Sequence, residues 1–215
     1  MKSKKVVVLV AIGILLITSS VGIFSYANVS FFKPKQQVLL VYAKGSAFVE
    51  EWKKVDSLEQ HGLSKSALDE VEKILAKSRT QNNHQQIVKA LIIKAKFQSY
   101  LEENAFKLTL SEIEKEAEGA TYPLKPMLHS VIAELYWQYY QNNRWKFYNR
   151  TTTVGFAQDD IETWDITKII ERTIHHYLLS IKDIDELKRT PVNTFEDVII
   201  KKDSSEKFRP FLYDF

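Results

Sequence analysis

The chain of 215 residues contains no cysteine, and it has only six glycines and five prolines. The absence of cysteine excludes a disulfide framework, a thiol nucleophile and a thiolate metal site. The sequence also lacks a glycine-rich phosphate loop, the serine elbow of α/β-hydrolases and the HExxH pattern of zinc proteases. We therefore expect no enzymatic activity, no metal and no cofactor in this chain.

The small excess of positive charge is concentrated at the N-terminus. The formal net charge is +3 and the pI is about 8.8, but Lys2, Lys4 and Lys5 precede an apolar segment. Without these three lysines the remainder is near neutral, which gives no electrostatic argument for nucleic-acid binding. The composition, with 45% hydrophobic and 27% charged residues, is ordinary for a globular protein.

Residues 1–27 have the pattern of an export segment. A short cationic stretch precedes the apolar run Val6–Ile17, and Ser25 and Ala27 match the small residues of a cleavage site. If the segment is not cleaved, residues 6–27 are long enough to span a bilayer as a single signal anchor. Both alternatives place the rest of the chain in the periplasm or cell envelope, either released or anchored in the inner membrane.

The remaining sequence is predicted to be all-α. Residues 28–48, with one short β-favouring run at Val38–Tyr42, are interpreted as a linker. Over residues 49–215 apolar side chains recur at helical spacings. These spacings predict a first helix closed by Gly62, hairpins that start near Ser64 and Glu103, a helix from about Lys125 to Gln141 and a last helix capped by Asp165. Ser64 is predicted to cap its own helix. The last helix is expected to bury a face that includes Ile166, Ile169, Thr173, Leu178 and Ile181.

The aromatic segment around residues 127–148 has two interpretations. Seven apolar residues between Met127 and Tyr139 form one helical face, and Ala133, Trp137 and Tyr140 form a second face, which predicts burial between two neighbours. This pattern favours an irregular array of antiparallel helical hairpins, either tetratricopeptide-like or an α-bundle. The alternative is a glycan- or peptide-binding surface past the end of the helix, formed by Arg144, Trp145, Phe147, Tyr148 and Arg150.

Two sets of neighbouring polar side chains are candidate metal sites. His175 and His176 are adjacent in a predicted helix and point about 100° apart, so that they cannot share a metal on that helix. Asp159, Asp160 and Glu162 crowd one loop, but the spacing and the glycine of an EF-hand are missing. A solvated loop that leads into the next helix is the favoured interpretation.

Two longer segments resemble a known family. WKKVDSLEQHGLSKSALDEVEKI (residues 52–74) and, more distinctively, HSVIAELYWQYYQNNRWKFYNRT (residues 129–151) look like the N-terminal helical region of alpha-2-macroglobulin-family proteins of Bacteroidetes. The likeness continues in DDIETWD and SSEKFRPFLYDF. The resemblance implies an exported module that precedes the macroglobulin domains of a protease-inhibitor protein. Those domains, the bait region and the thioester would lie beyond this region.

Two hypotheses for function follow. The first is a non-catalytic interaction or spacer module with a protein partner in the cell envelope, and the second is the glycan- or peptide-binding surface described above. The C-terminal tail is a further candidate surface, because Phe211, Tyr213 and Phe215 belong to an apolar cluster that follows Pro210. We expect this cluster to be the first turn of a helix with an exposed face, and to support self-association.

Overall fold

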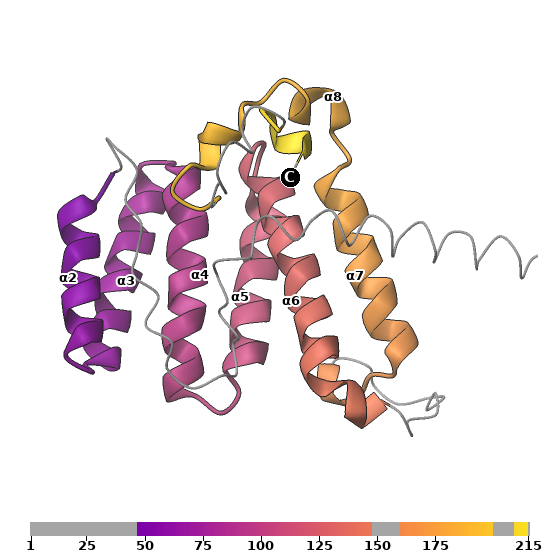
Figure 1. Ribbon diagram of the computed structural model, residues 1–215, viewed down its shortest axis with the longest axis horizontal. Helices are drawn as coiled ribbons and strands as arrows, with labels where there is room; N and C mark the ends of the chain where they lie inside the picture. Colours follow the sequence, from indigo (N-terminus) through magenta and orange to yellow (C-terminus); the bar gives the residue numbers. More distant parts are fainter. Residues whose placement is uncertain (1–46, 148–159, 200–208, 215) are drawn as a thin grey trace, which may run out of the picture. The chain divides into compact units, whose positions relative to one another are not determined.

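The computed structural model describes residues 47–147, 160–199 and 209–214. Within these ranges the protein is all-α, with seven α-helices and no β-strand, as the sequence predicts (Figure 1). No helix among the described residues is long and apolar enough to cross a membrane. The predicted export segment, residues 1–27, and the possible strand at Val38–Tyr42 lie outside the described ranges.

The chain divides into two compact units. Unit 1 is formed by Met1–Ala105 together with Ile184–Phe215, and unit 2 is formed by Phe106–Asp183. Each unit has its own hydrophobic core and is described separately below.

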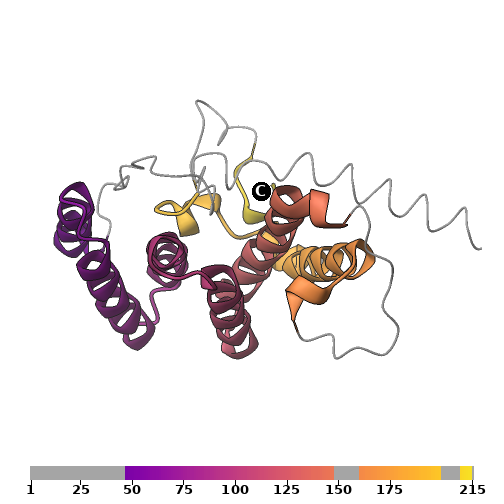
Figure 2. The ribbon, with the colours of Figure 1, turned by 90° about the horizontal axis from the view of Figure 1, so that it is seen from below.

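Unit 1 contains three helices that lie side by side, namely α2 (Val49–Gln60), α3 (Ser64–Thr80) and α4 (His84–Leu101) (Figures 1 and 2). Gly62 ends the first of them as predicted, since it adopts a left-handed conformation with φ 73° and its N–H donates to the Glu59 carbonyl at 2.9 Å. Ser64 is not a cap, which corrects the prediction, because Leu63 holds the N-cap position without a side-chain hydrogen bond. Asn83 caps α4 by accepting from the N–H of Gln86.

Helix α4 is the most extensively buried helix of unit 1, with ten buried residues. Its buried residues include polar Gln86, which joins it to two other segments of unit 1. The indole N–H of Trp52 on α2 donates to Gln86 Oε1 at 2.7 Å, and Gln86 Nε2 donates to Asp197 at 2.6 Å. Because buried amides are stable only when hydrogen-bonded, this chain fixes α4 against α2 and the segment after η2 (Val192–Phe195).

The C-terminal tail pairs with the segment that follows α8 (Ile184–Leu187). The N–H of Val192 donates to the Pro210 carbonyl, and the N–H of Leu212 donates to the Thr190 carbonyl, both at 2.9 Å. Leu212 is buried and begins a short 3-10 turn, η3 (Leu212–Asp214), rather than the first turn of an α-helix. The described tail therefore folds back within unit 1, and self-association through it stays a prediction.

Unit 2 contains the second predicted hairpin, α5 (Ala105–Gly119) and α6 (Leu124–Phe147), followed by η1 (Ile161–Thr163) and α7 (Ile166–Ser180). Pro123 directly precedes α6 and Pro126 lies in its first turn, where the fixed φ and the missing N–H of proline are tolerated. All members of the predicted apolar face of α6 are buried: Met127, Leu128, Val131, Ile132, Leu135, Tyr136 and Tyr139. The two helices of the hairpin contact each other through aromatic side chains, since the ring centroids of Phe106 and Tyr139 lie 4.7 Å apart.

The second face of α6 differs from the prediction. Ala133 is buried, but Trp137 and Tyr140 are only half-buried and contact each other with ring centroids 5.4 Å apart and planes inclined by 39°. The helix also continues past Gln141 to Phe147, and the side-chain amide of Asn143 donates to the Tyr139 carbonyl at 2.9 Å. Asn142 and Asn143, which directly follow the predicted end of the helix at Gln141, lie within α6.

Helix α7 buries only part of the predicted face. Its buried residues are Ile169, Thr173, His176 and Ser180, which recur at spacings of four and three. Ile166, Leu178 and Ile181 are exposed. The prediction is confirmed for Ile169 and Thr173 and wrong for Ile166, Leu178 and Ile181, because three of the four buried positions carry polar side chains.

The capping interactions give a direct test of the helix boundaries. Asp165 accepts a hydrogen bond from the Lys168 N–H at 2.8 Å and caps α7 as predicted. We expect Asp165→Ala to lower the free energy of unfolding by about 1 kcal/mol, the usual effect of losing an N-cap. Ser64→Ala is the matched control and is expected to have little effect, since Ser64 makes no cap. Urea denaturation followed by circular dichroism measures both, and equal losses would contradict the assignment of Asp165 as the cap.

Candidate functional site

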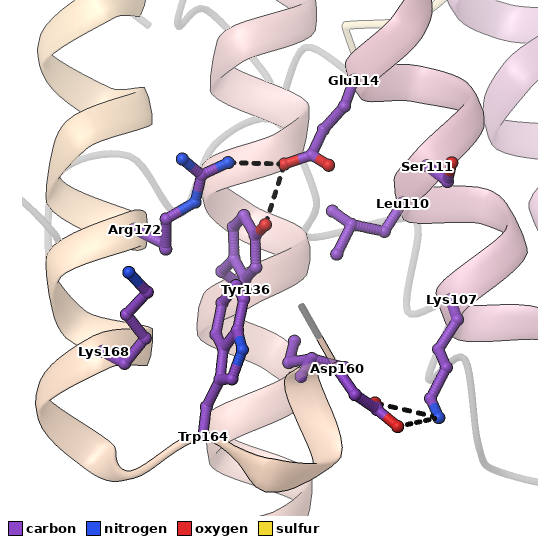
Figure 3. A pocket seen from close by; sticks show the side chains of 10 residues that line it. Lys107, Leu110, Ser111, Glu114, Tyr136, Asp160, Trp164, Lys168 and Arg172 are labelled. Atoms are coloured by element: carbon purple, nitrogen blue, oxygen red, sulfur yellow. Dashed lines mark hydrogen bonds and ion pairs between the residues drawn. The ribbon is translucent and has the colours of Figure 1, made fainter. Parts of the chain in front are cut away.

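Unit 2 contains a pocket of about 640 Å³ between α5, α6, η1 and α7. This volume lies within the range of small-ligand sites. Its lining combines charged, hydroxyl and apolar side chains (Figure 3): Lys107, Leu110, Ser111, Glu114, Tyr136, Asp160, Ile161, Trp164, Lys168 and Arg172. The close-up shows Lys107, Leu110 and Ser111 on the α5 side, with Lys168 and Arg172 on the α7 side.

Glu114 is the centre of a hydrogen-bond cluster at one end of the pocket. Its Oε1 accepts from the Tyr136 hydroxyl and from Arg172 Nη2, each at 2.8 Å, and His176 Nε2 lies 3.7 Å away. Burial, followed by the negative charge of Glu114, raises the pKa of Tyr136 above its usual range. Tyr136 is therefore a neutral hydrogen-bond donor, and three helices are joined through one carboxylate oxygen.

The wall between the two charged sides is aromatic. Tyr136 and Trp164 stack with ring centroids 5.7 Å apart and planes inclined by 19°. Cations from α7 lie over both rings: the Lys168 ammonium is 5.8 Å from the Trp164 centroid, and the Arg172 guanidinium is 5.6 Å from that of Tyr136. These distances fit cation–π contacts, which stabilise the positive charges beside the pocket.

The acidic loop is held by a lysine. Lys107 on α5 lies 3.0 Å from Asp160 and 3.1 Å from Glu162, and the hydrogen bond to Asp160 is the main cause of a raised Lys107 pKa. Asp160 also caps η1 by accepting from the Glu162 N–H. This arrangement fits the favoured interpretation of a loop that leads into the next helix. Asp159 lies outside the described residues, and no group of potential metal ligands is found among the described ones.

The two adjacent histidines have different environments. His175 is exposed, whereas His176 is buried and its Nδ1 lies 3.1 Å from Nδ1 of His129 on α6. At this distance one Nδ1 donates and the other accepts, so only one of the two rings carries a proton at Nδ1. Burial, followed by the positive charge of Arg172, lowers the pKa of His176 to about 3. Burial also lowers the pKa of His129, and Lys125 and His175 act in the same direction.

The predicted aromatic surface is only partly open. Trp145 is 70% exposed on the last turn of α6, Arg144 beside it is exposed, and the Lys146 ammonium lies 5.4 Å from the Trp145 ring. Phe147 is buried against Tyr139 and Tyr140. Its inclusion in an open stacking surface was therefore wrong, because the helix continues and turns this ring inward. Tyr148 and Arg150 lie outside the described residues.

The candidate residues of the tail lie in unit 1. Phe211 and Tyr213 are 39% and 43% exposed, and the Lys188 ammonium lies 4.8 Å from the Tyr213 ring. Phe215 lies outside the described residues. These rings are therefore partly covered by their own unit rather than fully available as a surface.

A scan against protein-family models, a search of curated proteins and a search of solved structures find no match to this chain. The resemblance to the N-terminal region of alpha-2-macroglobulin-family proteins stays a prediction. The fold and the pocket define an all-α protein made of helical hairpins. Function must be inferred from these features and from the targeting pattern of the sequence.

Proposed function

We propose that this chain is an exported, non-catalytic helical module that binds a protein partner in the cell envelope. The observation that carries the proposal is the exposed Arg144–Trp145 surface at the end of α6. Tryptophan and arginine are the residues most enriched among those that dominate protein–protein binding energy. Trp145 is held on a helix that Phe147 anchors to the core, so little conformational entropy is lost when a partner covers the ring.

The pocket of unit 2 also supports binding rather than catalysis. Its carboxylates are engaged with cations of the same unit, because Glu114 pairs with Arg172 and Asp160 with Lys107. A general base must reach the proton that it removes from a substrate. The export pattern of residues 1–27 and the resemblance of residues 52–74 and 129–151 support a docking or spacer role outside the inner membrane.

Site-specific photo-crosslinking tests the proposal. A photoreactive phenylalanine analogue placed at position 145 of the full chain is expected to give one or a few protease-sensitive adducts of defined mass in intact cells. The matched control is the same analogue at position 171 in the same unit, where exposed Glu171 is normally found. Absence of adducts at position 145, or the same adducts at both positions, would argue against a partner at this surface.

The glycan-binding alternative predicts a different result. An open indole that stacks on sugar rings would show quenching of its fluorescence on addition of envelope polysaccharides, and Trp145→Phe would reduce the quenching. The protein-binding proposal predicts no quenching across a panel of polysaccharides. Quenching that depends on Trp145 would therefore favour the alternative.

A further inference from the structure

We propose that the pocket of unit 2 is a binding site for a monoanionic carboxylate with an apolar body. This site is distinct from the Arg144–Trp145 surface, and the inference does not depend on the proposed protein partner. The argument rests on the charge balance of the lining, the spacing of two cations on α7 and the nature of the pocket walls.

The lining holds three cations, Lys107, Lys168 and Arg172, and two carboxylates, Glu114 and Asp160. Lys107 lies between Asp160 and Glu162, and Arg172 pairs with Glu114. Lys168 also lines the pocket, but among the described residues no carboxylate lies within ion-pair distance of its ammonium. Its described contact is the Trp164 ring at 5.8 Å. The lining therefore carries one positive charge that no described carboxylate balances.

This unmatched charge lies beside a second cation. Lys168 and Arg172 are four residues apart on α7, a spacing that places them on the same face of the helix and that is unfavourable for like charges. Figure 3 shows both side chains on the α7 side of the pocket, with the Arg172 guanidinium directed at Glu114. An anion placed between the ammonium and the guanidinium would remove the repulsion and pair with both cations.

Arg172 has donors to spare for such an anion. A guanidinium has five N–H groups, and only Nη2 is directed at Glu114 in the described contacts. Its Nε is buried without a hydrogen-bond partner among the described residues. Arginine pairs with carboxylates through two parallel hydrogen bonds, so a rotation of this side chain could present two donors to one ligand group.

The other residues that line the pocket indicate the chemistry of the ligand outside its carboxylate. Leu110, Ile161 and the edges of the Tyr136–Trp164 pair are apolar, and the Ser111 hydroxyl lies on the opposite side from Lys168. Glu114 stands beside Arg172 and would repel a dianion such as phosphate more strongly than a monoanion. The lining therefore fits a single carboxylate attached to an aromatic or aliphatic group.

NMR titration of the full chain with 3-phenylpropanoate tests the inference. We expect the Trp164 indole N–H signal, one of four in this protein, to shift with a dissociation constant near 1 mM or below, as for a weak small-ligand site. The primary amide of the same compound and inorganic phosphate are expected to shift it at least ten times more weakly. Free and amidated C-terminal phenylalanine peptides then distinguish a small molecule from a chain terminus as the source of the carboxylate.

Two lysine variants provide the matched comparison. Lys168→Met removes the unmatched charge and keeps most of the side-chain stem, and it is expected to weaken binding about tenfold. Lys146→Met removes a lysine that lies over a different tryptophan, Trp145, outside the pocket, and is expected to change nothing. Unchanged binding in Lys168→Met, equal shifts with the amide, or no shift of the Trp164 signal at saturating probe would each overturn the inference.

Discussion

Replacing Tyr136 with alanine is expected to lower the free energy of unfolding by about 3–5 kcal/mol, the range observed when a large aromatic side chain is removed from a core. Tyr136 is 1% exposed, stacks on Trp164 and donates to Glu114 at 2.8 Å. The substitution leaves a cavity and removes one of the donors of the Glu114 oxygen. Urea denaturation monitored by far-UV circular dichroism measures the loss.

Two variants separate the contributions. Tyr136→Phe keeps the ring and removes the hydroxyl, so we expect a loss of only about 1 kcal/mol from the hydrogen bond. Trp137→Ala changes the next residue, which has a larger ring but is half-buried, and we expect a smaller loss than for Tyr136→Ala. If Trp137→Ala proved as destabilising as Tyr136→Ala, the placement of the two faces of α6 in the structure would be wrong.

The periodicity of α6 shows which features are predictable from the sequence. The apolar face from Met127 to Tyr139 is confirmed, because a row of large side chains at spacings of three and four has only one way to be buried in a helix. Local caps are also predictable where the geometry involves neighbouring residues. Asp165 and Gly62 act within one turn of their own position, and both are confirmed.

The errors have a common physical origin in contacts between distant residues. Burial of Trp137 and Tyr140 depends on whether a neighbouring helix covers them, and that neighbour is not encoded in their spacing. The exposed Leu178 and the buried His176 on α7 are the same kind of error. His176 is inward because His129 lies opposite it, 47 residues earlier in the chain.

The pocket was not found in the sequence for the same reason. Its charged residues come from three places, Lys107 and Glu114 on α5, Asp160 before η1, and Lys168 and Arg172 on α7. None of these forms a motif in the sequence, and all but Asp160 occur in α-helices, where charged surface residues are common. The sequence feature that could have indicated the pocket is the pair Lys168 and Arg172, whose i,i+4 spacing places two like charges on one face of the helix.

The buried histidine pair makes a prediction about acid stability. His176 in the folded protein has a pKa of about 3, and the pKa of His129 is also lowered. Unfolded histidines have a pKa near 6.5, so below this pH the unfolded chain binds more protons than the folded one. Stability linked to the pair is therefore present above pH 6.5 and is lost as the pH falls toward 3. For His176 alone we expect a loss of about 2 kcal/mol between pH 7.5 and pH 5.

Comparison of two adjacent substitutions measures this contribution of His176 without the background from carboxylates. His176→Gln removes the titrating ring from its position between His129, Arg172 and Glu114, and we expect the stability of this variant to fall less steeply between pH 7.5 and pH 5 than that of the parent. His175→Gln removes the neighbouring exposed ring, which is the weakest of the causes that lower the pKa of His176, and it is expected to change the slope less than His176→Gln does. Urea denaturation at a series of pH values gives each slope. Because the variants share all their carboxylates, the difference between the slopes reports on one histidine. Identical slopes for His176→Gln and the parent would show that this ring takes up its proton without unfolding the helices around it.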